Sequence, residues 1–274
     1  MTSAVASLRQ GVGGFTGVLR AQTMLWSQYR ANLAIWATTG MLQSIVYLSV
    51  WRAVANASGG AVGGYDAAQF AGYFCVMLFV REMTYSFIAW HLSGTVQQGA
   101  IAPMLARPQH PVLYFLAEMT SYRLVSITLV VPAAFAVGWY FDAEVHPSVG
   151  AVVVALLLLP LASVVRTLGD VLIGLTSVKF IRIGGILTSY YTVVVFMSGQ
   201  FAPLTVLPDW MQTVAKALPF WWIVGYPVEL LMGRADPHQA WIAALVLLTW
   251  FVAAMTFLRW VWPRAMRAAE TVGG

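Results

Sequence analysis

Six ionisable side chains fall in or near apolar stretches of this chain: Arg81, Glu82, Glu118, Arg123, Arg166 and Asp170. A charge near the centre of a bilayer costs about 2.5–3.5 kcal/mol on insertion scales, so cations and anions in such surroundings are expected to pair. Arg166 and Asp170 are four residues apart and can meet on one helix face. Two interpretations stay open: an inner gate whose pairs separate and re-form, or a static network that includes groups just outside the hydrocarbon.

Other side chains with reactive chemistry are scattered. The four histidines, His91, His110, His146 and His238, lie in different connecting segments and have no metal-ligand spacing. The sequence has no GxSxG, no HExxH and no GxxxxGK[ST] phosphate-binding loop. We therefore expect no catalytic residue, no metal site and no cofactor in this chain, and no ATP hydrolysis by it.

The composition indicates a membrane protein. Hydrophobic residues make up 60% of the chain and charged residues only 9%, whereas soluble domains have about 25% charged residues. The apolar runs are about 20 residues long, which suits helices rather than the strands of a barrel. The net charge of +5 comes from arginines dispersed between these runs, which favours a role in topology over a nucleic-acid surface.

We predict an all-α integral membrane fold with six transmembrane helices. The predicted spans are residues 33–54, 70–90, 112–139, 149–176, 183–198 and 241–262. They form one membrane domain, residues 33–262, between a segment 1–32 and a tail 263–274. Because most arginines and lysines lie on the side of the two chain ends, we expect both termini to be cytoplasmic.

Two segments on the expected cytoplasmic side carry patterns of their own. Residues 18–30 place Val18, Leu25 and Tyr29 on one helical face, which predicts a helix lying in the inner membrane interface. The alternative is a plain extension of the first span. The loop 91–111 is too polar to span, and its short ordered stretch suits the docking of a soluble partner. A simple connecting loop is the alternative there.

The segment 199–233 breaks an apolar region too often for one straight helix. Pro208, Pro219 and Pro227 interrupt it, yet it remains rich in tryptophan, phenylalanine and tyrosine. This combination predicts a backbone that enters the outer membrane surface and returns. Glu229 is an unusual acid for a position near the lipid, and it is expected either to hold the segment together or to gate an exit.

Aromatic and methionine side chains in two spans are candidates for lining a path for an apolar molecule. They are Phe74, Met77 and Phe79 in the second span and Tyr190, Tyr191 and Met197 in the fifth. Methionine and aromatic surfaces adapt to poorly specific apolar ligands. The alternative is that they pack the protein or face lipid.

Three stretches together resemble the membrane subunit of a type-2 ABC exporter, an ABC-2-type transporter permease. They are YRANLAIWATTGMLQSIVYLSVWRA at 29–53, GAIAPMLARP at 99–108, and FAPLTVLPDW, ALPF and YPVELLMG within 201–233. The resemblance is especially to the six-span branch of this family, formerly described only as a domain of unknown function. The resemblance covers nearly the whole chain, and the order of the motifs carries it.

The resemblance implies roles for several segments. Residues 18–30 would be an elbow helix, and 199–233 would contain two outer re-entrant helices at about 209–217 and 224–232. The first cytoplasmic loop would couple to a separate ATPase subunit, which carries ATP and Mg. The coupling residues would be Thr95, Gln97, Gln98, Ile101, Met104 and Arg107.

The same resemblance implies a multi-pass protein of the bacterial inner (plasma) membrane that pairs with a second permease, identical or related. Such a dimer would export an amphipathic small molecule, for example a drug, an antibiotic or another xenobiotic, or a lipid, by alternating access. Membrane lipids are expected partners and nucleic acid is not. A membrane-embedded enzyme, a channel or a structural anchor that works without an ATPase is the alternative.

Overall fold

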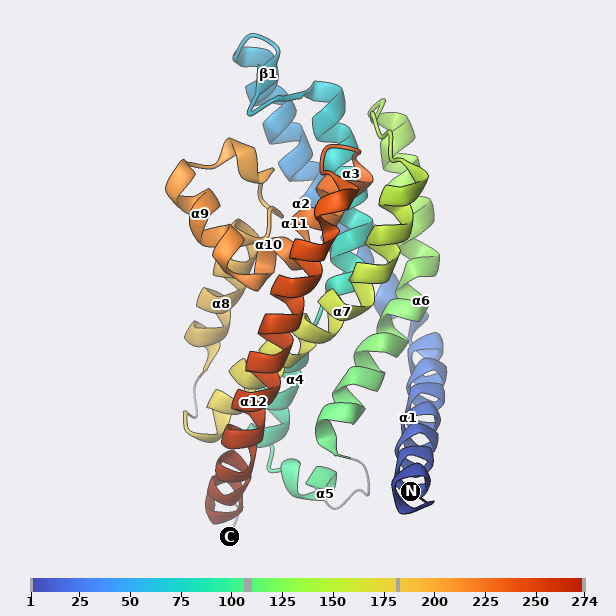
Figure 1. Cartoon of the computed structure of the whole chain (residues 1–274), viewed down its shortest axis with the longest axis vertical. Coiled ribbons are helices and arrows are strands. Elements are labelled where there is room, and N and C mark those ends of the chain that lie inside the picture. The colour runs from blue at the N-terminus through green and yellow to red at the C-terminus, as the bar shows by residue number, and fades with distance from the viewer. Residues whose placement is uncertain (1, 106–109, 181–182, 273–274) are drawn as a thin grey trace.

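The computed structural model describes residues 2–105, 110–180 and 183–272. It is mostly helical, at 82%. The helices form an elongated bundle, with both chain termini and α5 at one end and a short β-hairpin at the other (Figure 1). We call these the termini end and the hairpin end.

The first half of the chain forms six helices and the hairpin. The elements are α1 (Thr2–Gln28), α2 (Arg30–Ala57), β1 (Ala61–Val62), β2 (Tyr65–Asp66), α3 (Ala67–Thr84), α4 (Ile88–Gln97), α5 (Ile101–Leu105) and α6 (Pro111–Tyr140). In the hairpin Val62 pairs with Tyr65 across a two-glycine turn. Gly63 and Gly64 have φ of 58° and 80°, which glycine adopts without strain.

The second half contains two long helices and a series of short ones between them. The elements are α7 (Val149–Gly174), η1 (Leu175–Val178), α8 (Gly184–Met197), η2 (Leu204–Val206), α9 (Asp209–Ala217), α10 (Pro219–Ile223), α11 (Gly225–Leu231), η3 (Pro237–Gln239) and α12 (Ala240–Val272). Among the described residues, four stretches are long and apolar enough to cross a membrane: Ala31–Ala57, Pro111–Tyr140, Val149–Val178 and Pro237–Arg267. They match the first, third, fourth and sixth predicted spans.

The second predicted span, residues 70–90, is wrong as a continuous helix. α3 ends at Thr84, Tyr85 is extended, and α4 begins at Ile88. Side chains of neighbouring helices satisfy the carbonyl groups that the break releases: the Ser163 hydroxyl donates to Met83 O at 2.6 Å, and Arg123 Nη2 donates to Tyr85 O at 2.9 Å. The break is therefore stabilised by tertiary contacts, which the apolar pattern of the sequence does not contain.

The fifth predicted span, residues 183–198, forms α8 at nearly the predicted bounds. This helix has only 14 residues. At 1.5 Å per residue it is about 21 Å long, less than the ~30 Å hydrocarbon core of a bilayer. The structure therefore supports four spanning helices by length and composition, and α3, α4 and α8 are shorter pieces within the same bundle.

The N-terminal helix differs from the predicted interfacial helix in length and in direction. α1 begins at Thr2, and it runs beside α6 along the bundle rather than across it (Figure 1). Its inner face contains Gln22, whose Nε2 donates to Tyr114 Oη at 2.6 Å, whereas the predicted face residues Leu25 and Tyr29 are exposed. α1 continues into the first span after a bend at Tyr29, and its place in the membrane interface stays a prediction.

The broken segment 199–233 forms three short helices at the hairpin half of the bundle. α9 has the bounds predicted for the first short helix, α11 lies within the bounds 224–232 predicted for the second, and α10 is a further short helix that the sequence did not predict. Pro208 precedes α9, and Pro219 begins α10, where its missing N–H costs nothing. No helix here exceeds nine residues, about 14 Å, so none crosses a bilayer.

A close helix–loop contact fixes the hairpin half of α3. The loop between α6 and α7 lies against its first turns, where Glu144 N donates to Ala68 O at 3.3 Å. Gly72 is buried at this contact, and an added Cβ would collide with the Glu144 carbonyl oxygen. Asp66 caps the same helix by accepting hydrogen bonds from Ala68 N and Gln69 N.

We predict that Gly72→Ala lowers the stability of the purified protein by about 1–3 kcal/mol, because the loop must move to admit a methyl group. Denaturant unfolding in detergent measures this. The matched control is Gly17→Ala in α1, where nothing lies within 4 Å of the new Cβ. Equal stability of Gly72→Ala and the parent protein would contradict the close contact.

Candidate functional site

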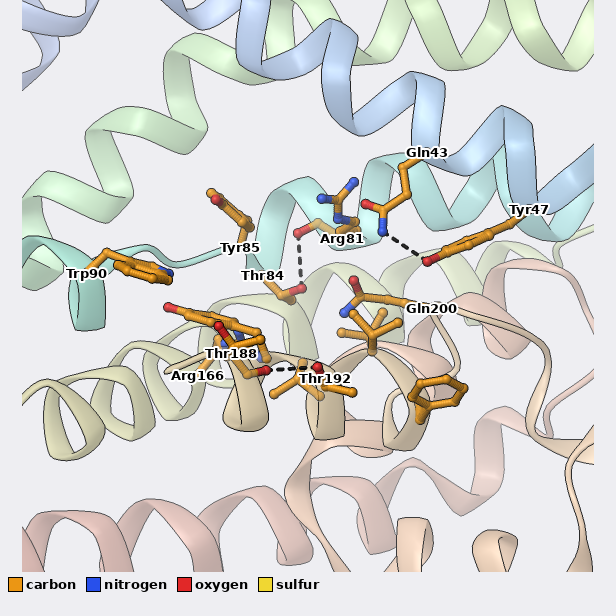
Figure 2. A pocket seen from close by; sticks show the side chains of 15 residues that line it. Gln43, Tyr47, Arg81, Thr84, Tyr85, Trp90, Arg166, Thr188, Thr192 and Gln200 are labelled. Carbon is orange, nitrogen blue, oxygen red and sulfur yellow. Dashed lines mark hydrogen bonds between the residues drawn. The ribbon is translucent and has the colours of Figure 1, made fainter. Parts of the chain in front are cut away.

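A cavity of about 530 Å³ opens between α2, α3, α4 and α8 (Figure 2). Gln43 and Tyr47 come from α2, Arg81 and Tyr85 from α3 and the break after it, and Thr188 from α8. The break of α3 and the shortness of α8 leave this space between the longer helices. The cavity combines polar side chains, aromatic rings and arginine within a helical bundle, where ligand sites commonly form.

The wall formed by α2 and α3 presents hydrogen-bonding groups. Arg81 Nη1 donates to Gly40 O at 3.2 Å, and its guanidinium lies 6.0 Å from the Tyr85 ring centroid. Gln43 Nε2 donates to Tyr47 Oη at 3.1 Å. Figure 2 shows Arg81 and Gln43 side by side, across the cavity from Thr188 and Thr192.

A buried ion pair lies at the back of the cavity. Arg166 Nε is 3.3 Å from Asp170 Oδ1, and both side chains are buried. Tyr190 and Tyr191 donate their hydroxyl hydrogens to the two Asp170 oxygens at 3.0 and 2.9 Å. The Arg166 guanidinium also lies over both tyrosine rings, at 5.4 and 5.5 Å. This cluster joins α7 to α8 and places Arg166 on the cavity wall.

The other predicted inner charges form separate contacts rather than one network. Glu118 Oε1 lies 3.1 Å from His91 Nδ1, which joins α6 to α4. Arg123 donates to Tyr85 O and, at 3.2 Å, to Thr167 Oγ1. Glu82 lines a smaller cavity of about 110 Å³ together with Arg81. Whether any of these groups opens as a gate stays a prediction.

Of the predicted path residues, the structure places Tyr191 on this cavity. Phe74 and Met77 are fully buried in the core, which fits their alternative role in packing. Phe79 lines a different cavity, between α3 and α6. Tyr190 turns toward Asp170, and Met197 packs against the cluster around η2.

Sequence reasoning missed Gln43, Tyr47, Trp90 and Gln200, which all line the cavity. The sequence does contain an indication of one pair of lining residues, because Gln43 and Tyr47 are four residues apart in an apolar span. Polar groups at such positions face the protein interior or a water-filled space. The path residues predicted from the sequence belong only to the second and fifth spans, whereas the first span also lines the cavity.

The predicted coupling residues lie at the termini end, around the turn between α4 and α5. Gln98 is exposed there, and Gly99 takes a φ of 68° that reverses the chain. Ile101 and Met104 are buried in a core cluster, so they anchor α5 rather than face outward. Thr95 Oγ1 and Gln97 Nε2 each bond within α4, to His91 O and to Ser93 Oγ. Arg107 lies outside the described residues.

Glu229 holds the broken segment to the hairpin. Its Oε2 accepts a 2.6 Å hydrogen bond from the buried Tyr65 hydroxyl, and Arg234 Nε lies 3.8 Å away. Arg234 stacks over the Tyr65 ring at 3.9 Å and donates to Gly64 O at 2.9 Å. Burial raises the pKa of Glu229, against the opposing effects of the Tyr65 hydrogen bond and Arg234. Pro227 lies inside α11, two residues before Glu229.

Comparison with known proteins gives one family. A family model described as "ABC-2 family transporter protein" matches residues 41–273, which is most of the chain. No curated protein matches.

We predict that Asp170→Asn destabilises the protein by about 3–5 kcal/mol, because it leaves the buried Arg166 charge without an anion. The double variant Arg166→Met with Asp170→Leu removes both charges and should recover most of that loss. Unfolding of the purified variants measures both, with Asp209→Asn on the exposed start of α9 as the control. A double variant less stable than the single one would show that charge pairing is not the source of the effect.

We also predict that Tyr65→Phe loosens the hairpin end by about 1–3 kcal/mol, since a buried carboxylate oxygen loses its donor. Hydrogen exchange of the α11 amides should accelerate by the corresponding factor. Tyr140→Phe removes an exposed hydroxyl and serves as the matched control. Unchanged exchange in α11 would contradict the role given to the Tyr65–Glu229 bond.

Proposed function

Because this chain belongs to the ABC-2 family of transporter proteins, we propose that it is the membrane permease subunit of an ATP-driven exporter. A separate ATPase subunit binds ATP and Mg, and a second permease completes the transport unit. The cargo is an amphipathic small molecule, such as a drug or antibiotic, or a lipid. The family match over residues 41–273 is the observation that carries this proposal.

The geometry of the termini end supports ATPase docking. The α4–α5 turn projects with exposed Gln98 and Gly99, while Ile101 and Met104 fix its base in the core. α4 also packs on α7, and His91 pairs with Glu118 of α6. These contacts connect the turn to the long helices, so in the proposed cycle a push on the turn would move α4 together with α6 and α7.

The position of the cavity supports a path for cargo. It lies between α2, α3, α4 and α8, so movements of these helices in the proposed cycle would change its shape. The short helices α9–α11 lie toward the hairpin end, and we propose that they close the outer mouth as re-entrant helices. With the termini end in the cytoplasm of a bacterial cell, ATP-driven closure of the ATPase pair opens the path outward.

The docking proposal is tested by co-expression with candidate ATPase subunits that contain GxxxxGK[ST]. We predict that Gln98→Glu reduces co-purification of the ATPase about 5–30-fold, because an unpaired charge at the contact costs about 1–2 kcal/mol. Gln239→Glu makes the same change at an exposed position near the hairpin end and should have no effect.

A further outcome separates the alternatives. If the purified chain never associates with such an ATPase and proteoliposomes conduct solute without nucleotide, the exporter proposal fails and a channel is favoured. If transport in proteoliposomes requires ATP and the ATPase subunit, the channel and the membrane-embedded enzyme are excluded as its principal role.

A further inference from the structure

The cavity between α2, α3, α4 and α8 carries an excess of positive charge. Arg81 and Arg166 both line it, and among the described residues no aspartate or glutamate lines it. The Asp170 carboxylate, which does not itself line the cavity, neutralises the charge of the Arg166 guanidinium. Arg81 has no such counterion: no carboxylate of the described residues is ion-paired with it, and one of its N–H groups bonds to the neutral Gly40 carbonyl.

The acids nearest to this cavity are directed elsewhere. Asp170 is fully buried and is held by Arg166, Tyr190 and Tyr191. Glu82 follows Arg81 along α3 and projects about 100° around the helix from it, and it does not line this cavity, although both residues line the smaller one. The guanidinium of Arg81 has five N–H donors, so it retains capacity for an anionic ligand.

The rest of the lining suits an apolar body beside that charge. Tyr47, Tyr85, Trp90, Tyr191 and Phe196 contribute aromatic rings, and Val194 and Val195 add aliphatic surface. The amide groups of Gln43 and Gln200 lie among them and can orient a polar head group. A volume of about 530 Å³ falls within the range of small-molecule sites.

We propose that this cavity binds an amphipathic anion. Its acidic head group, a carboxylate or a similar oxyanion, contacts Arg81 between Gln43 and Gln200, and its apolar body lies against the aromatic walls. A cation of the same shape meets an unneutralised guanidinium instead, and a neutral analogue gains nothing from it. The inference names the cargo class and so rests on the proposed exporter function, but binding itself requires no ATPase.

Direct binding tests the charge preference. The probe is 11-(dansylamino)undecanoate, with its methyl ester and the alkylamine of equal length as neutral and cationic analogues. Tryptophan-to-dansyl energy transfer is titrated on the full chain in uncharged detergent. We expect the carboxylate to bind about tenfold or more tightly than the ester, and the amine more weakly still. Equal or tighter binding of the amine would overturn the proposal.

Variants locate the site. Arg81→Gln should weaken carboxylate binding about tenfold and leave ester binding unchanged, and Arg81→Lys should restore part of the preference. Arg52→Gln is the matched control, because Arg52 lies over Phe141 outside the cavity. Thr192→Trp fills the cavity from an exposed helix position and should block all three probes. Full binding in both Arg81→Gln and Thr192→Trp would also overturn the proposal.

The reconstituted complex separates this inference from the proposed function. Stimulation of ATP hydrolysis by the carboxylate, but not by the amine, supports both. Selective carboxylate binding to a chain that pairs with no ATPase supports the cavity assignment and contradicts the exporter. ATP-driven transport of the amine, together with its preferential binding, supports the exporter and contradicts the anionic cargo.

Discussion

Polar groups inside this bundle must find partners within the protein, because lipid around the helices offers no hydrogen bonds. The break after α3 shows how this requirement is met. Ser163 donates to Met83 O and Arg123 to Tyr85 O, so two carbonyl groups that an unbroken helix would satisfy are bonded from α7 and α6. Asp170 is buried only because Arg166 and two tyrosine hydroxyls surround it. The charged side chains thus stabilise irregular backbone and connect helices.

This arrangement also creates the cavity. The break changes the direction of α4, and the tyrosines of the α7–α8 cluster hold α8 in place. The cavity between these helices is lined by Arg81, Gln43 and Gln200 together with aromatic rings. The interactions that allow a broken helix in an apolar medium therefore also position the candidate ligand-binding groups. Fold stability and the proposed cargo site depend on neighbouring residues of α7 and α8.

At the hairpin end, polar side chains also find their hydrogen-bond and ionic partners within the protein. Tyr65, Glu229 and Arg234 bring the hairpin, α11 and the chain leading to α12 into one contact. Thr205 Oγ1 adds a bond to Gly63 O, and Trp51 Nε1 donates to Phe201 O. The segment that contains the short helices α9–α11 is consequently bonded to α2 and to the hairpin between α2 and α3. In the proposed transport cycle they follow the movement of those helices rather than move as a free loop.

The sequence by itself determined the apolar helical class, four long spans, the bounds of α8 and α9, and the proline-broken segment, because these follow from composition, hydrophobic run length and the chemistry of proline. The resemblance of its motifs also pointed to the family that residues 41–273 match. The tertiary structure alone decided that residues 70–90 break at Tyr85 and that Gln22 rather than Leu25 faces inward. It also decided that six inner charges divide into separate contacts and that α2 contributes to the cavity. Each of these depends on which residues of distant helices meet, and local periodicity contains no information about such partners.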